Sequence, residues 1–116
     1  MIQEMHHLAV IVSGEKSVEF YERLGFKIFK CVERHQDKVL LLYGHGMRLE
    51  IFVDASHLPR PVPEPLGFRH LALRVDDIAK TSSEMDLDIG PIMEDWLGDK
   101  FCFTSDPDGN MIELHE

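Results

Sequence analysis

The chain has 116 residues, which is enough for one domain and too few for two ordinary ones. Apolar residues make up 44% and charged residues 28%, a composition typical of globular and not of disordered proteins. The 12 basic and 21 acidic residues give a net charge of −9, which argues against nucleic acid and anionic membranes as partners. No apolar run reaches the roughly 20 residues of a membrane span, and the N-terminus lacks a secretory pattern. We therefore expect a cytoplasmic protein, in which Cys31 and Cys102 are buried, reduced thiols.

The first half of the chain predicts a strand, a helix and three further strands. The helix over residues 15–24 has apolar residues at helical spacing, and Gly25 is well placed to end it. Polar or glycine-containing breaks at 35–37 and 44–46 separate the later strands. The predicted strands are residues 6–12, 26–33, 38–43 and 47–52.

The second half predicts the same order of elements after a proline-rich linker. Four prolines between residues 54 and 67 exclude a helix or a central strand there. Asp76 or Asp77 can cap a short helix that runs to about Met85. Asp106-Pro107-Asp108-Gly109 predicts a tight turn before the last strand. The predicted strands are residues 68–75, 92–96, 100–104 and 111–115. We thus predict an α+β fold of two tandem β-α-β-β-β modules, at about 5–53 and 67–116, with a linker at about 54–66.

A repeat with an offset of 63 residues relates the two modules. The segment that begins at His7 resembles the one that begins at His70, and the segment around Glu50 resembles the one around Glu113. The spacing from histidine to glutamate is therefore 43 residues in both halves. Because both ends lie in matching apolar strands, chance explains this spacing poorly.

The alternation of side chains along the strands places the repeated residues on one face. In each of the four strands, polar residues share one side and aliphatic residues the other, so the aliphatic side should face a helix. Two imidazoles and two carboxylates on one concave surface predict a divalent-metal site. The predicted ligands are His7, Glu50, His70 and Glu113. The set suits Zn, Ni, Co, Mn or Fe(II), and it leaves positions free for water or substrate.

The other histidines and both cysteines fit this site less well. His6 should point to the opposite face from His7, and it aligns with an arginine in the repeat. His115 shares a face with Glu113 and is interpreted as a pocket residue. His35, His45 and His57 fall in predicted turns or in the linker, where we expect them to be solvated. Neither cysteine has a neighbouring base that would make it a nucleophile.

Four segments together resemble the vicinal-oxygen-chelate superfamily, which comprises glyoxalases, bleomycin-resistance proteins and extradiol dioxygenases. They are His7–Val10, Phe20–Phe26, Gly67–Ala72 and Asp106–Leu114. The resemblance covers nearly the whole chain and is strongest to small bacterial glyoxalase I-like proteins of the YaeR type. It implies eight strands in a cupped mixed sheet, a metal held at His7, Glu50, His70 and Glu113, and commonly a homodimer.

The resemblance also implies a reaction. A small substrate with two adjacent oxygens would bind to the metal, Zn or Ni above all, and a carboxylate would remove a proton to give a metal-stabilised enediolate. The implied catalytic residues are Glu113 and its near-symmetric counterpart Glu50. For glyoxalase I the substrate is the hemithioacetal of methylglyoxal and glutathione. The cations near enough in sequence to hold such an anionic thiol adduct are Arg34, Arg48, Arg69, Arg74 and Lys100.

Two other functions fit parts of the pattern. An Fe(II) dioxygenase would use three ligands, His7, His70 and Glu113, and Glu50 as a fourth would occupy a position needed for oxygen. A non-enzymatic drug- or metabolite-binding protein of the bleomycin-resistance kind would bind in an apolar cleft, and the complete ligand set counts against it. The aromatic residues that such a cleft would use, and which core packing explains better, are Phe52, Trp96, Phe101 and Phe103.

Overall fold

The computed structural model describes all 116 residues, which form two compact units, residues 1–58 and 59–116. Each unit contains a strand, a helix and three strands in that order, and each has one four-stranded mixed sheet. The α+β class and the two β-α-β-β-β modules are therefore confirmed. No helix of the chain combines the length and the apolar character needed to cross a membrane.

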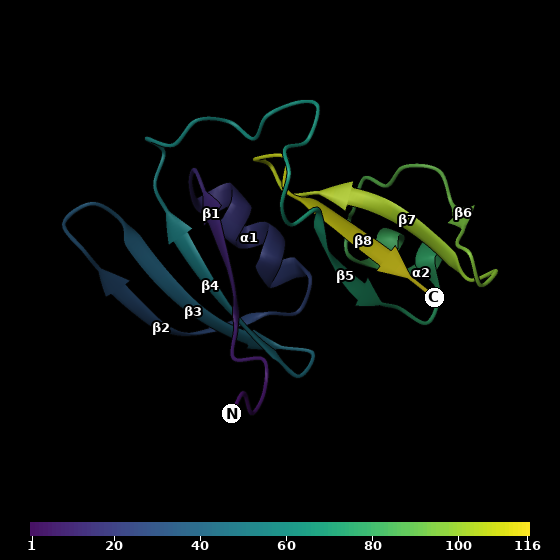
Figure 1. Ribbon diagram of the computed structural model, residues 1–116, viewed down its shortest axis with the longest axis horizontal. Coiled ribbons are helices and arrows are strands. Elements are labelled where there is room, and N and C mark those ends of the chain that lie inside the picture. Colours follow the sequence, from purple (N-terminus) through teal and green to yellow (C-terminus); the bar gives the residue numbers. More distant parts are fainter. The chain divides into compact units, whose positions relative to one another are not determined.

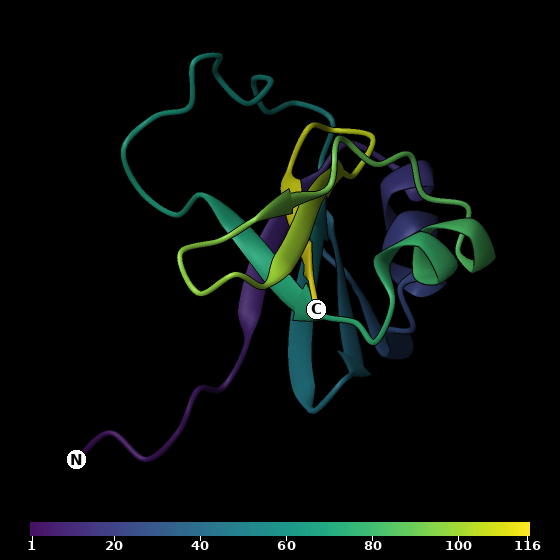
Figure 2. The same ribbon diagram turned by 90° about the vertical axis from the view of Figure 1, so that its right-hand side faces the viewer.

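Unit 1 contains a mixed sheet and a single helix that lies along one of its faces (Figures 1 and 2). The strand order is β1-β4-β3-β2, in which β1 and β4 are parallel and the other pairs are antiparallel. As predicted, Gly25 follows the end of the helix, directly after the cap residue Leu24, and its φ of +99° is a conformation that glycine adopts readily. The elements are β1 (Leu8–Val12), α1 (Glu15–Arg23), β2 (Lys27–Glu33), β3 (Lys38–Gly44) and β4 (Met47–Val53).

Unit 2 repeats this topology with the strand order β5-β8-β7-β6. Of the two predicted helix caps, Asp77 is the one used, because its carboxylate accepts the backbone N–H of Lys80 at 2.8 Å. The elements are β5 (His70–Arg74), α2 (Ile78–Glu84), β6 (Met93–Glu94), β7 (Lys100–Ser105) and β8 (Met111–His115).

The strand predicted over residues 92–96 is wrong in its extent, because β6 has only two residues. Asp95 ends it. Its carboxylate Oδ1 accepts the backbone N–H groups of Leu97 and Asp99 at 2.8 and 2.9 Å, and this turns the chain back toward β7. Apolar residues resume at Trp96 after Glu94 and Asp95, so periodicity alone could not place this turn.

Burial alternates along the strands as predicted. Leu49 and Ile51 are fully buried on β4, and Ile112 and Leu114 are almost fully buried on β8. The residues between them, Glu50 and Glu113 included, are only partly buried. The sequence pattern therefore correctly assigned the aliphatic side to the core and the polar side to the surface that carries the repeated residues.

The prediction for the cysteines holds for one of the two. Cys102 is buried on β7, and burial, together with the nearby charge of Glu113, raises the pKa of its thiol. Cys31 is exposed, contrary to the prediction. It lies on β2, the edge strand of its sheet, whose residues are all exposed. An apolar strand pattern cannot show on its own that a strand lies at an edge.

The turn before β8 depends on one buried carboxylate. Asp106 is 2% exposed and accepts three hydrogen bonds, from the backbone N–H of Asp108, the backbone N–H of Asn110 and the Asn110 amide, each at 2.9 Å. We expect Asp106→Ala to lower the free energy of unfolding by roughly 2–4 kcal/mol, because half-buried donors lose a charged acceptor. Urea unfolding measures this loss, and Asp88→Ala, at an exposed aspartate of the same unit, is the control. A loss equal to that of the control would contradict the assigned role.

Candidate metal centre

The repeat in the sequence is also a repeat in strand register. In unit 1, Ala9 on β1 pairs with Glu50 on β4. In unit 2, Ala72 on β5 pairs with Glu113 on β8. Both members of the pair are shifted by the same 63 residues, so the two glutamates occupy equivalent positions of equivalent parallel strand pairs.

Unit 1 brings His7 and Glu50 together. His7 Nδ1 lies 3.3 Å from Glu50 Oε2, and the side chains are 35% and 21% exposed. His6 joins them, since its Nδ1 lies 2.8 Å from Nδ1 of His7, and one donor atom from each of the three residues lies within 4.8 Å of the others. The expectation that His6 points away from His7 is wrong. Both residues precede β1, which begins at Leu8, so strand alternation constrains neither of them.

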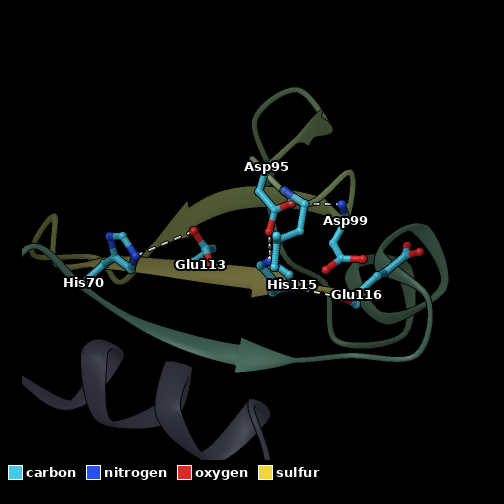
Figure 3. Close-up of polar contacts among 7 residues, drawn as sticks. His70, Asp95, Asp99, Glu113, His115 and Glu116 are labelled. Atoms are coloured by element: carbon cyan, nitrogen blue, oxygen red, sulfur yellow. Dashed lines mark hydrogen bonds and ion pairs between the residues drawn. The ribbon is translucent and has the colours of Figure 1, made fainter.

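Unit 2 brings His70 and Glu113 together in the same manner (Figure 3). His70 Nε2 lies 3.6 Å from Glu113 Oε1, and the side chains are 22% and 16% exposed. Phe103, the cross-strand neighbour of Glu113 on β7, packs edge-to-face against the His70 ring at 5.2 Å between centroids. The aromatic contact limits the rotation of His70, so its imidazole is held toward the glutamate.

The distances within both pairs fit shared ligation of an ion. At 3.3 and 3.6 Å, nitrogen and oxygen are further apart than in a good hydrogen bond. Two ligands with bonds of roughly 2.0–2.2 Å to one ion lie about 3.0–3.5 Å apart. Each pair also combines an imidazole with a carboxylate, the ligand types that Zn, Ni, Co, Mn and Fe(II) accept. Each pair, taken by itself, thus fits a divalent metal.

The remaining histidines differ from the prediction in one case. His45 is not simply solvated, because its Nε2 lies 2.6 Å from the carbonyl oxygen of Leu24 at the end of α1. His57 lies 3.4 Å from the carboxylate of Asp54 at the start of the linker. His35 is exposed, as expected for a residue in a turn.

The cations considered for binding an anionic substrate now divide into two groups. Arg34 donates two hydrogen bonds of 2.6 Å to the carboxylate of Asp37, and Arg69 donates one of 2.8 Å to Glu64. Arg48 packs over the ring of Phe29 and lies on the same strand face as Glu50. The paired arginines are engaged elsewhere, which leaves Arg48, Arg74 and Lys100 as the better cations for a substrate.

None of the four aromatic residues considered for an apolar cleft belongs to the buried core. Phe101 and Phe103 pack edge-to-face with each other at 5.7 Å, and Phe103 also contacts His70. Trp96 is fully exposed at the turn after β6. Core packing as their main role is therefore wrong, and on β7 the two phenylalanines lie beside the repeated residues.

Sequence reasoning missed a second group of possible ligands, Asp95, Asp99 and His115 (Figure 3). Donor atoms of the three residues lie within 4.8 Å of one another. His115 was recognised as a pocket residue, but nothing in the sequence linked it to the two aspartates. Asp95 falls in the strand predicted over residues 92–96 and Asp99 in the break after it, so their four-residue spacing gave no sign that they converge.

Comparison with known proteins identifies the family. Residues 4–114 match the Glyoxalase/Bleomycin resistance protein/Dioxygenase superfamily, and the chain belongs to that superfamily. It is 32% identical to the protein YaeR of Escherichia coli, over 99% of this chain and 97% of that protein. A glyoxalase family protein from Enterococcus faecalis has a similar structure, with a TM-score of 0.88 and 35% identity over 98% of each chain.

More distant structures share the fold. The fosfomycin resistance protein FosX of Listeria monocytogenes, in a variant bound to Mn(II) and 1S,2S-dihydroxypropylphosphonic acid, has a TM-score of 0.78 at 17% identity, over 99% of this chain and 92% of that chain. A lactoylglutathione lyase from Agrobacterium tumefaciens has a TM-score of 0.68 at 16% identity, over 99% of this chain and 94% of that chain. At these identities the likeness shows that the fold is shared.

Proposed function

We propose that the protein is a metal-dependent lyase or isomerase of the glyoxalase I type, and that His7, Glu50, His70 and Glu113 together bind one divalent metal ion, Zn or Ni above all. The observation that carries the proposal is the paired geometry. Each module holds a histidine and a glutamate at equivalent positions, with their donor atoms 3.3 and 3.6 Å apart. The Mn(II) complex of FosX and the lactoylglutathione lyase support metal chemistry on this fold.

The residues of the site have different roles in the proposed reaction. A bound divalent ion supplies Lewis-acid polarisation of two adjacent substrate oxygens. Glu113 takes the proton from the carbon next to them, because a carboxylate close to the substrate can act as a general base. His70 stays as a ligand, since Phe103 restrains its ring. Arg48, Arg74 or Lys100 would hold an anionic part of the substrate.

The partner of the protein in this proposal is a small molecule with two neighbouring oxygens, of which the hemithioacetal of methylglyoxal and a thiol is the first to test. We also propose that the chain works as a homodimer in the cytoplasm, as the family resemblance implies. The four ligands would then come from one chain or from two.

A panel of thiol adducts tests this function. Metal-free protein is reconstituted with Zn, Ni, Co or Mn and assayed with methylglyoxal hemithioacetals of several thiols, including glutathione. We expect turnover with at least one combination and none with metal-free protein. Uptake of no metal, or metal uptake with oxygen consumption in place of isomerisation, would contradict the proposal.

A further inference from the structure

His115 is held in an orientation that leaves one ring nitrogen for a cation. Its Nδ1 lies 2.8 Å from the backbone carbonyl oxygen of Glu116, and this oxygen can only accept a hydrogen bond, so Nδ1 carries the proton. A histidine that ligates a metal commonly donates its other ring N–H to such a carbonyl group. The ring also stacks on Phe101, at 6.4 Å between centroids and 17° between planes.

The nitrogen that remains faces a carboxylate. Nε2 of His115 lies 2.8 Å from Oδ2 of Asp95, and the side chains are 22% and 18% exposed. An imidazole nitrogen and a carboxylate oxygen are both ligand atoms for a divalent ion. At 2.8 Å they are at the distance of a hydrogen bond, so an ion bound by both would move them slightly apart, to about 3.0–3.5 Å.

Asp99 favours the cation. A carboxylate oxygen of Asp99 lies within 4.8 Å of both donor atoms, so three ligand atoms converge where an ion pair of His115 and Asp95 would need only two. The other carboxylate oxygen of Asp95, Oδ1, accepts the backbone N–H groups of Leu97 and Asp99, and these hydrogen bonds fix the orientation of the carboxylate. One imidazole and two carboxylates would neutralise a divalent ion and match the ligand preferences of Zn, Co, Ni and Mn.

The burial of the two units gives a reason for such an ion. Of the fifteen buried apolar residues, eleven lie in unit 1 and four, Ile78, Cys102, Ile112 and Leu114, lie in unit 2. Small modules with little buried apolar surface commonly depend on a bound metal or a disulfide. An ion at these residues would join the turn after β6 to the end of β8, two parts of unit 2 that are 20 residues apart for Asp95 and His115.

We propose that Asp95, Asp99 and His115 bind a second divalent transition-metal ion, in addition to any ion bound at His7, Glu50, His70 and Glu113, and that this ion fixes the turn that carries Trp96. The turn presents Trp96 and Leu97, which are 103% and 86% exposed. Trp96 is the only tryptophan of the chain and follows Asp95 directly, so its fluorescence reports on this site.

Cobalt binding tests the proposal separately from the proposed enzymatic site. Chelator-treated protein is dialysed against Co²⁺, and the bound ion per chain and the Trp96 emission are measured. The Glu50→Gln variant weakens the other site from unit 1 and leaves unit 2 unchanged. In this variant we expect one strongly bound cobalt ion per chain and the loss of most of the Trp96 emission. Adding Asp99→Asn should remove both effects.

Asp88→Asn is the matched control, because it makes the same charge change at an exposed aspartate of unit 2 that lies outside the cluster. Asp99→Asn is preferred to a change at Asp95, whose carboxylate also holds the turn together. If the Glu50→Gln protein binds no cobalt, or if Asp99→Asn leaves cobalt binding and Trp96 emission unchanged, the second site is excluded.

Discussion

Glu113→Gln should lower kcat on the true substrate by about 100- to 10,000-fold, which is the range that a general base contributes. Glutamine keeps the shape of the side chain, but its neutral amide oxygen ligates a metal more weakly than a carboxylate does and cannot take a proton from carbon. Glu113 is 16% exposed and lies 3.6 Å from His70. At saturating metal, where the variant is fully loaded, the loss should therefore fall on kcat.

Three measurements make this result specific. Metal content and circular dichroism show that the variant is loaded and folded, and steady-state kinetics separate kcat from KM. Glu84→Gln, at an exposed glutamate of α2, is the control for the charge change. Wild-type turnover in a metal-loaded Glu113→Gln protein would remove Glu113 from the proposed mechanism.

Glu50→Gln tests the other half of the repeat. Because Glu50 occupies the equivalent register position, we expect the same weakening of metal binding and a smaller loss of kcat at saturating metal. We expect the larger loss of kcat at Glu113 because its neighbour Phe103 packs against His70, whereas in unit 1 the aromatic neighbour of His7 is His6. If both variants lose kcat equally once they are loaded, the two carboxylates share the role of base.

The sequence predicted the fold well because its signals were local and redundant. Alternation identified the buried side of β4 and β8, and glycine and proline marked most of the breaks. The predictions that were wrong share a cause. The end of β6 at Asp95, the exposure of Cys31 on an edge strand and the bond from His45 to Leu24 all depend on tertiary contacts. Periodicity contains no information about such contacts.

The candidate metal residues divide in the same way. The sequence points to four of them, His7, Glu50, His70 and Glu113, because the repeat gives two copies of one spacing. The cluster of Asp95, Asp99 and His115 has no copy in unit 1, and it depends on a turn that the strand pattern concealed. A site that occurs once and is assembled from a turn and a distant strand leaves no such signature in a single sequence.

His7→Ala and His70→Ala should each lose the stabilisation that a bound metal ion gives to the folded protein, and to the same extent, although the two residues lie in different units. If four residues bind one ion, removing either histidine takes one of four ligands and should weaken the affinity by at least about 100-fold. At a metal concentration of about 100 Kd, an ion that binds only folded protein stabilises it by about 2.7 kcal/mol. For a chain of this size that corresponds to roughly 10 °C in Tm, which both variants should lose.

The alternative is that each unit binds an ion of its own, for which His6, His7 and Glu50 in unit 1 offer three donors. In that case His70→Ala would leave the ion of unit 1 in place, and half of the bound metal would remain. Thermal unfolding and metal content, measured with Zn²⁺ in an Asp99→Asn background so that the second proposed site does not contribute, distinguish the two arrangements. His35→Ala removes an exposed turn histidine and should change neither quantity. If one ion is shared, both variants should lose the bound metal and the added stability to the same extent, because all four ligands hold the same ion.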